Sequence, residues 1–228
     1  PKKGIFVAPK TGVYFFTYSI LMAYSTPLDT TLRRNAAIIG TLERTSTTRV
    51  EDHSSRGNLV NLLKGDMVYV MLNNDVDIYG KDTFRRNSFS GFLYEPVHGV
   101  SSGWSVARRK SWDAPEDLSP IPFDDVFVNN WGHWSETANQ YICPYTGIYH
   151  ITFTVASQPF KPVDVSLMVD GDKRASLISS TTGNNGIVVM SRSILLYLSR
   201  KNEVYLKAKG GTAFYGSLER QTSFTGLF

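Results

Sequence analysis

The chain alternates large apolar and small polar side chains in short segments, and one such segment occurs twice. Residues 6–20 read FVAPKTGVYFFTYSI, and residues 141–155 read YICPYTGIYHITFTV. After the Pro-x-Thr-Gly turn of each copy, every second residue is large and apolar, which predicts a strand with one buried face. In the two copies this face is predicted to carry Tyr14, Phe16, Tyr18, Tyr149, Ile151 and Phe153.

The repeat extends over a whole domain. The segment SFSGF at 88–92 corresponds to SFTGL at 223–227, 135 positions later, which is also the spacing between the two long copies. The turn and strand at 64–72 have a counterpart that begins at Lys201. A period of this length indicates two tandem domains rather than a solenoid of small units.

A stretch without alternation, EPVHGVSSG at 95–103, predicts the boundary between the domains. We expect one domain at 1–96, a linker at 97–103 and a second domain at 104–228. Residues 104–138 have no counterpart before the first copy, so the first domain is predicted to be incomplete at its amino-terminal end. We expect its opening strands to precede Pro1. Two alternatives stay open: the domain lacks these strands, or another chain supplies them by strand addition.

The remaining pattern predicts only strands and turns. Asp170-Gly171 and Asn184-Asn185-Gly186 are hairpin signals between apolar segments, whereas the polar stretch 44–57 is predicted to be a loop. Because no stretch of ten residues shows helical apolar spacing, we predict an all-β fold, either a sandwich or a jelly roll.

Composition narrows the possible functions. Of the 228 residues, 42% are hydrophobic, enough for packed cores, and no apolar run approaches the roughly 18 residues of a membrane helix, so we expect no membrane insertion. A net charge of +4 with scattered basic pairs argues against nucleic acid binding. The single cysteine, Cys143, excludes a disulfide within the chain and any multi-thiolate metal site, and it is predicted to be a buried thiol.

The spacing of eight residues in the second domain resembles the signature of the complement C1q globular-head domain, within the TNF-like jelly-roll superfamily. These residues are Phe123, Asn129, Trp134, Tyr141, Gly147, Tyr149, Ile151 and Phe153. The family has phenylalanine where Tyr141 and Ile151 stand. The first domain matches the later part of the signature through Phe6, Gly12, Tyr14, Phe16 and Tyr18.

The resemblance implies two tandem ten-stranded TNF-like jelly-roll sandwiches, the first lacking its opening strands in this sequence. It also implies a secreted protein that forms a homotrimer or a higher assembly of trimers. The signature residues Phe6, Tyr14, Phe16, Tyr18, Phe123, Trp134, Tyr141, Tyr149 and Phe153 would then serve the core or the assembly.

The glycines show no collagen period, so the chain is similar to stalkless invertebrate C1q-domain-containing proteins. The resemblance then implies a recognition protein of innate immunity that binds glycans or microbial and other anionic surfaces. Two alternatives stay open: a structural, storage or mineral-matrix protein whose function is self-assembly, and a TNF-like signalling ligand. The four histidines are far apart and no serine lies in a glycine-flanked elbow, so we expect no enzymatic activity.

Three groups of residues are candidate sites. Trp131, with Asn130 and His133 beside it, is typical of carbohydrate contact, although it could equally anchor a subunit interface. Arg85 and Arg86 could pair with an anionic ligand or simply be solvated. Asp75 and Asp77 could bind calcium or form an ordinary turn, and no other cofactor is expected.

Overall fold

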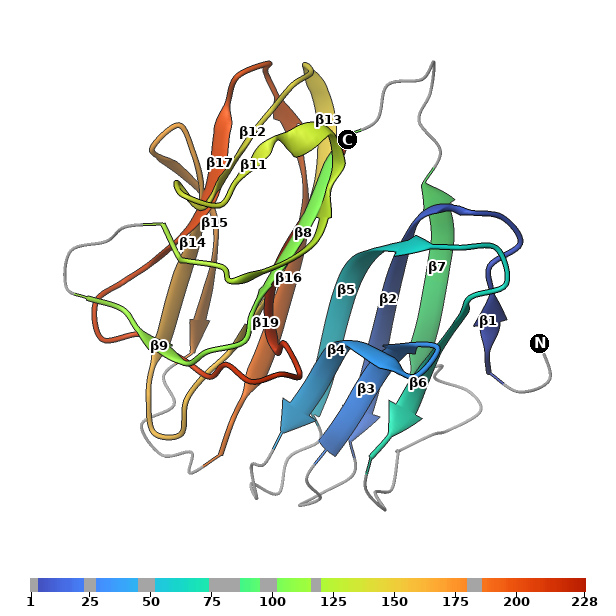
Figure 1. Ribbon diagram of the computed structural model, residues 1–228. Helices are drawn as coiled ribbons and strands as arrows, with labels where there is room; N and C mark the ends of the chain where they lie inside the picture. The colour runs from blue at the N-terminus through green and yellow to red at the C-terminus, as the bar shows by residue number, and fades with distance from the viewer. Residues whose placement is uncertain are drawn as a thin grey trace.

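The protein folds into two β-sandwiches that lie side by side, one on each side of Figure 1. The computed structural model describes residues 4–22, 28–44, 52–73, 87–94, 102–115, 120–179 and 186–228. Within these ranges, no helix is long and apolar enough to cross a membrane. The described elements are nineteen β-strands and one short 3-10 turn, so the predicted all-β fold is confirmed.

The second sandwich consists of two five-stranded antiparallel sheets. One sheet, called the contact sheet below, has the order β10-β8-β19-β13-β16, and the other has the order β11-β12-β17-β14-β15. The strands of the contact sheet are β8 (Gly103–Arg108), β10 (Asp125–Asn129), β13 (Gly147–Ala156), β16 (Val189–Leu198) and β19 (Thr222–Leu227). The other sheet contains β11 (Trp134–Ser135), β12 (Gln140–Ile142), β14 (Val163–Val169), β15 (Asp172–Ser179) and β17 (Glu203–Ala208). Two short strands, β9 (Trp112–Asp113) and β18 (Ala213–Phe214), pair with each other.

The first sandwich repeats the later strands of this plan. Its contact sheet has the order β5-β2-β7 and its other sheet the order β1-β6-β3-β4. The strands are β1 (Phe6–Val7), β2 (Gly12–Met22), β3 (Leu28–Arg34), β4 (Ala37–Arg44), β5 (Asp52–Leu62), β6 (Met67–Leu72) and β7 (Ser88–Tyr94). Whereas β19 lies between β13 and β8, its counterpart β7 pairs only with β2 in the described part of the chain. The first jelly roll therefore lacks its opening strands here, as the repeat predicted.

The repeated Pro-x-Thr-Gly-x-Tyr motif has one structural role in both domains. The tyrosine hydroxyl donates a hydrogen bond to the carbonyl oxygen four residues earlier, at 2.8 Å for Tyr14 and 2.9 Å for Tyr149. The hydroxyl of Thr11 accepts a hydrogen bond from a backbone N–H of the turn after β5, at 3.0 Å. The hydroxyl of Thr146 accepts the equivalent hydrogen bond from the turn after β16, at 2.9 Å. The motif thus ties the start of its own strand to the neighbouring turn, which explains why these polar residues recur.

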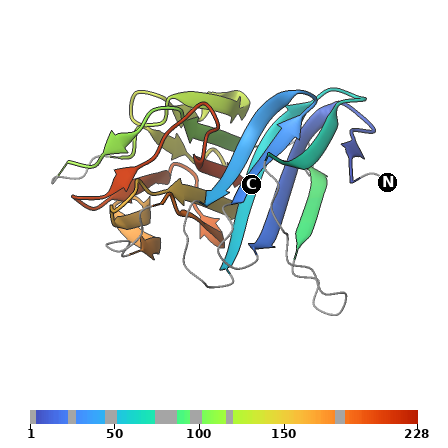
Figure 2. The same ribbon diagram turned by 90° about the horizontal axis from the view of Figure 1, so that it is seen from below.

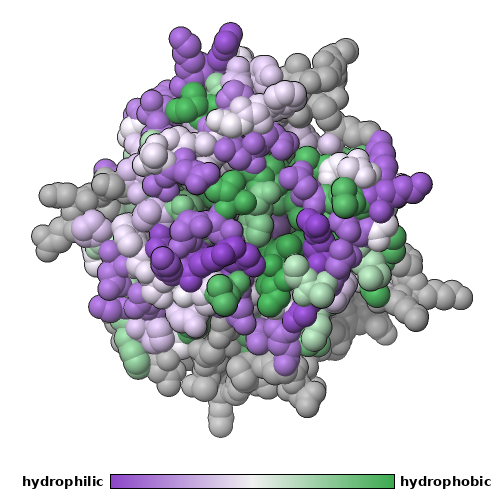
Figure 3. Space-filling model, in the orientation of Figure 1, coloured by the Kyte–Doolittle hydropathy of each residue, from purple (hydrophilic) through white to green (hydrophobic). Residues whose placement is uncertain are grey.

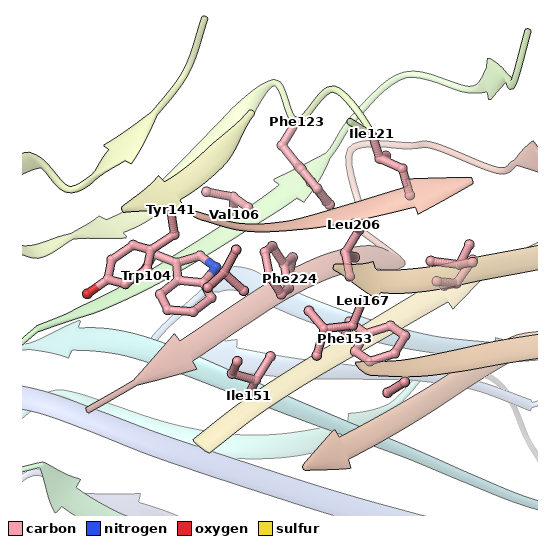
Figure 4. Packing of buried hydrophobic residues seen from close by; sticks show 14 of the residues in the cluster. Trp104, Val106, Ile121, Phe123, Tyr141, Ile151, Phe153, Leu167, Leu206 and Phe224 are labelled. Carbon is pink, nitrogen blue, oxygen red and sulfur yellow. The ribbon is translucent and has the colours of Figure 1, made fainter. Parts of the chain in front are cut away.

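Aromatic side chains fill the space between the two sheets of each domain. In the second domain, Trp104 and Tyr141 stack with ring centroids 3.9 Å apart, and Trp104 meets Phe224 edge to face at 5.1 Å (Figure 4). The signature residues that are buried are Tyr14, Phe16, Tyr18, Phe123, Trp134, Tyr141, Tyr149 and Phe153, while Phe6 is half-buried against the same core. Cys143 is also buried, and burial raises the pKa of its thiol to about 12. A neutral, inaccessible thiol is unreactive.

The prediction of a loop over 44–57 is wrong for residues 52–57, which form the first half of β5. Arg56 is fully buried there. Its Nε donates to Asn58 Oδ1 at 2.9 Å, and its Nη1 donates to the carbonyl oxygens of Thr41 and Gln221 at 3.0 and 3.1 Å. Burial lowers the pKa of Arg56 to about 10. β5 pairs with β2 of its own domain along its length, and because Gln221 belongs to the second domain, one hydrogen bond of the Arg56 guanidinium crosses the domain boundary.

The outer face of β5 lies on the contact sheet of the second domain, and Figure 2 shows β5 beside that domain. Leu59 and Phe15 form an apolar cluster with Val128 and Leu227 across the boundary. A Cβ atom added to Gly57 would lie 3.2 Å from Cγ2 of Thr152, so the absent side chain allows β5 to approach β13 closely.

Polar contacts surround this apolar cluster. Arg220 forms an ion pair with Asp125 and donates from Nη1 to the carbonyl oxygen of Ile38 at 2.9 Å. The hydroxyl of Tyr94 donates to the carbonyl oxygen of Phe228. Side-chain hydrogen bonds from both domains therefore fix the relative position of the two sandwiches.

Candidate functional site

The most exposed tryptophan of the described chain lies in a tight loop after β10. Trp131 is 76% exposed and sits in a three-residue 3-10 turn, η2 (Asn130–Gly132). Its backbone has a φ of 65°, in the left-handed region that side chains other than glycine seldom occupy. Such a conformation costs on the order of 1 kcal/mol or more and persists only where the surrounding structure enforces it.

The loop is held by its two flanking residues. The side chain of Asn129 accepts the backbone N–H of Trp134 at 2.9 Å and donates to the carbonyl oxygen of the same residue at 3.1 Å. Trp134 is itself buried, with its ring edge to face against Phe123 at 5.8 Å and against Phe224 at 6.0 Å. The core therefore anchors the end of the loop, and the Asn129 clasp positions the turn that displays Trp131.

His133 connects this loop to a hollow at one end of the second sandwich. The hollow has a volume of about 530 Å³ and is lined by His133, Ile142, Cys143, Pro144, Tyr145, Thr146, Arg200 and Lys201. Partial burial lowers the pKa of His133, so its imidazole is neutral at pH 7 and can both donate and accept a hydrogen bond. The hollow thus combines an uncharged imidazole with two cationic residues.

Arg200, Lys201, Tyr145 and Thr146 were not among the predicted site residues. The sequence places them in two turns more than fifty positions apart, and both turns were interpreted as structural. The sequence did offer one signal that the two turns belong together, because the equivalent turns recur in the first domain. The hydrogen bond from the backbone N–H of Arg200 to the Thr146 hydroxyl is what brings the turns together.

The other predicted sites lie outside the described residues. Asp75 and Asp77, the predicted calcium ligands, and Arg85 and Arg86, the predicted anion contacts, all fall between 74 and 86. Within the described ranges, no group of three or more His, Cys, Asp or Glu side chains could hold a metal ion.

A second hollow is lined by residues of both domains. It has a volume of about 540 Å³ and is lined by Arg34, Asn35, Ala36, Ala37, Ile38, Ile39, Phe127 and Arg220. Figure 3 shows hydrophobic residues gathered near the middle of one face of the molecule. Both cationic residues of this hollow already have acidic partners, Arg34 with Asp66 and Arg220 with Asp125, so its surface is mainly apolar.

Comparison with known proteins identifies both domains. The family model for the C1q domain matches residues 1–94 and again residues 103–228. The human complement C1q tumor necrosis factor-related protein 2 is 30% identical over 131 residues, which cover 56% of this chain and 44% of the human protein. The human complement C1q and tumor necrosis factor-related protein 9A is 32% identical over 123 residues, covering 50% of this chain and 34% of that protein. The chain thus spans less than half the length of these curated relatives.

Solved structures of similar shape include the globular domain of zebrafish complement 1qA protein and murine APRIL. The zebrafish domain has a TM-score of 0.43 at 18% identity and covers 57% of this chain and 97% of its own. Murine APRIL has a TM-score of 0.43 at 13% identity, covering 56% of this chain and 98% of its own.

Proposed function

Because this chain belongs to the C1q domain family, with two copies of the domain, we propose that it is a secreted, non-enzymatic recognition protein. It binds glycans or anionic surface polymers through the second domain, and assembly of several copies strengthens this binding. Domains of this family typically form trimers, and we propose a homotrimer or a higher assembly of trimers here.

The observation that supports this proposal most directly is the displayed Trp131. Its backbone is held in an unfavourable conformation by the Asn129 clasp, and the indole remains largely in solvent. An exposed aromatic ring can stack on the apolar face of a sugar. Asn130 and His133, on either side, supply polar groups for its hydroxyls.

The neighbouring hollow supports the anionic part of the proposal. Arg200 and Lys201 line it together with Thr146 and Tyr145. Guanidinium and ammonium groups beside hydroxyls match carboxylated or sulfated sugars and teichoic or phosphate-rich polymers. Weak binding at one such site becomes strong when several identical sites act together on one surface.

Binding of the purified chain to immobilised glycans and to whole bacteria tests the proposal. Trp131→Ala is expected to reduce binding about tenfold or more, because it removes the stacking surface. Leu218→Ala is the matched control, since Leu218 is equally exposed on another turn of the same domain. Arg200→Ala is expected to weaken binding to anionic glycans more than to neutral ones. Equal binding by all three variants would contradict the proposal, and ordered self-assembly without any ligand would favour a structural role.

A further inference from the structure

Arg56 carries a positive charge that is fully enclosed at the boundary between the two domains. The side chain is 0% exposed and belongs to β5 of the first domain, while one of its hydrogen-bond acceptors, the carbonyl oxygen of Gln221, belongs to the second domain. Burial lowers the pKa of Arg56 to about 10, so the guanidinium is still protonated at pH 7. A charge that persists at neutral pH therefore lies out of contact with solvent where the domains meet.

The acceptors that the described chain offers to this guanidinium are neutral amide oxygens. Nε donates to Oδ1 of Asn58 at 2.9 Å, and Nη1 donates to the carbonyl oxygens of Thr41 and Gln221 at 3.0 and 3.1 Å. Among the described residues, no carboxylate forms an ion pair with Arg56. An enclosed ion is strongly unfavourable unless an opposite charge lies beside it. The guanidinium thus has hydrogen-bond partners from the chain but lacks a counter-charge from its described part.

The charged side chains near Arg56 do not balance it. Arg220 is a like charge and lowers the pKa of Arg56 further. Asp125 of the second domain is already shared by two cations, Arg220 and Arg109. Glu219 is partly buried, which raises the pKa of its carboxyl group, and it accepts a hydrogen bond from a side-chain amide of its own turn. The positive charge of Arg56 is therefore left unbalanced by its described neighbours.

Two groups at this place have hydrogen-bond donors that the described chain leaves unused. Nη2 of Arg56 carries a pair of N–H donors, and it has no partner among the described residues. The hydroxyl of Thr41, whose carbonyl oxygen binds Nη1, is likewise buried without a partner in that part of the chain. Buried polar groups are almost always satisfied by the protein, by water or by an ion. Because an anion accepts hydrogen bonds from both groups and also supplies the opposite charge, it satisfies this place better than a water molecule.

We propose that Nη2 of Arg56 and the hydroxyl of Thr41 form a binding site for a small inorganic anion, namely chloride. The size follows from the enclosure, since Arg56, Thr41 and Gln221 are each 0% exposed. Sugar acids and phosphate-rich polymers, which suit the open hollow beside His133, are too large for it. The anion binds to a guanidinium that hydrogen-bonds to both domains, so it stabilises their contact. The inference does not depend on the proposed function.

Crystals of the chain grown in sodium bromide test the site directly, because bromide replaces chloride and scatters X-rays anomalously. An anomalous difference peak is expected beside Nη2 of Arg56. A well-ordered Arg56 without such a peak would overturn the inference and leave a water molecule as the partner of Nη2. Peaks confined to exposed cations, such as Arg174, would overturn it equally, because they would show adventitious binding only.

Thermal melting at constant ionic strength tests the same site in solution. Replacement of sodium gluconate, whose anion is too large for an enclosed site, by sodium chloride is expected to raise the melting temperature of the unmodified chain by about 3 °C or more. Arg56→Gln is expected to lose this rise, because the charge that holds the anion is gone. Arg34→Gln is the matched control and is expected to keep it, since Arg34 belongs to the same domain but is partly exposed and paired with Asp66. An equal rise in all three proteins would contradict the site.

A milder variant keeps the test decisive if Arg56→Gln does not fold. Thr41→Val removes the hydroxyl and retains the shape of the side chain, so it is expected to bind chloride about fivefold more weakly. The same rise in melting temperature would then require about fivefold more chloride. An unchanged chloride dependence in Thr41→Val would refute the assignment of this hydroxyl to the site, and the absence of any chloride dependence in the unmodified chain would refute the site as a whole.

Discussion

Replacing Leu59 by alanine tests whether the two domains stabilise each other as the structure indicates. The side chain is 2% exposed and lies in the apolar cluster between the domains, with a methyl carbon against Gly103 of the second domain. The change removes three carbon atoms, which at about 0.8 kcal/mol each gives about 2.4 kcal/mol of lost burial. A cavity left between two rigid sheets adds to this, so we expect a total loss of about 3 kcal/mol in the free energy of unfolding.

Tryptophan fluorescence makes the experiment specific to the contact between the domains. All four tryptophans belong to the second domain, while Leu59 belongs to the first. When urea unfolding is monitored by tryptophan fluorescence, the signal therefore reports the second domain. Circular dichroism reports the unfolding of both domains. At low micromolar concentration, Leu59→Ala is expected to lower the fluorescence midpoint as well as the dichroism midpoint, because the second domain loses a stabilising neighbour.

Leu63→Ala is the control for this experiment, since Leu63 is exposed just after the same strand and its replacement is expected to cost no more than about 0.5 kcal/mol. An unchanged fluorescence midpoint for Leu59→Ala, or a shift no larger than that of the control, would refute the packing of β5 on the second domain.

Two further predictions concern charge at the same boundary. Arg220→Ala removes the ion pair with Asp125 and the hydrogen bond to Ile38, and it is expected to lower the free energy of unfolding in urea by about 1–3 kcal/mol. Arg174→Ala, which removes an exposed ion pair, is the control and is expected to lower it by less than about 0.5 kcal/mol. Equal losses for the two variants would contradict a structural role for Arg220. Burial lowers the pKa of His150 beside Phe15, so the unfolded chain takes up a proton at a higher pH than the folded chain, and stability is expected to fall as the pH drops below about 6.5. Thermal melting from pH 7.5 to 5 should show a smaller decrease for His150→Phe, and an identical decrease would place the effect elsewhere.

Local pattern accounts for the sandwich cores. Alternation after the Pro-x-Thr-Gly turn identified the buried faces of β2 and β13, and the Asp170-Gly171 signal correctly placed the hairpin between β14 and β15. These features are readable because an isolated strand has one face to bury, and the spacing of two residues follows directly from its geometry.

The candidate site was only partly readable from the sequence. Trp131 stood out because it occupies a position usually given to smaller groups, and the structure places it on the surface beside Asn130 and His133. The hollow that adds Arg200 and Lys201 joins turns that are distant in the chain. Its formation depends on the register of β13 against β16, which no local pattern specifies.

By itself, the sequence determined that the chain contains two copies of one β-sandwich and which face of each repeated strand is buried in its own core, because that information is written in side chains two residues apart. Only the tertiary structure decided what happens on the opposite faces. There Leu59, which pairs with Phe15, is buried, whereas Leu195, which pairs with the equivalent His150, is exposed. The polar residue Arg56 is also buried in β5, where the sequence pattern predicted a loop. The physical reason is that two equivalent domains in one chain meet through unlike surfaces, so their contact covers Leu59 and Leu227 while the equivalent Leu195 and Phe92 stay exposed.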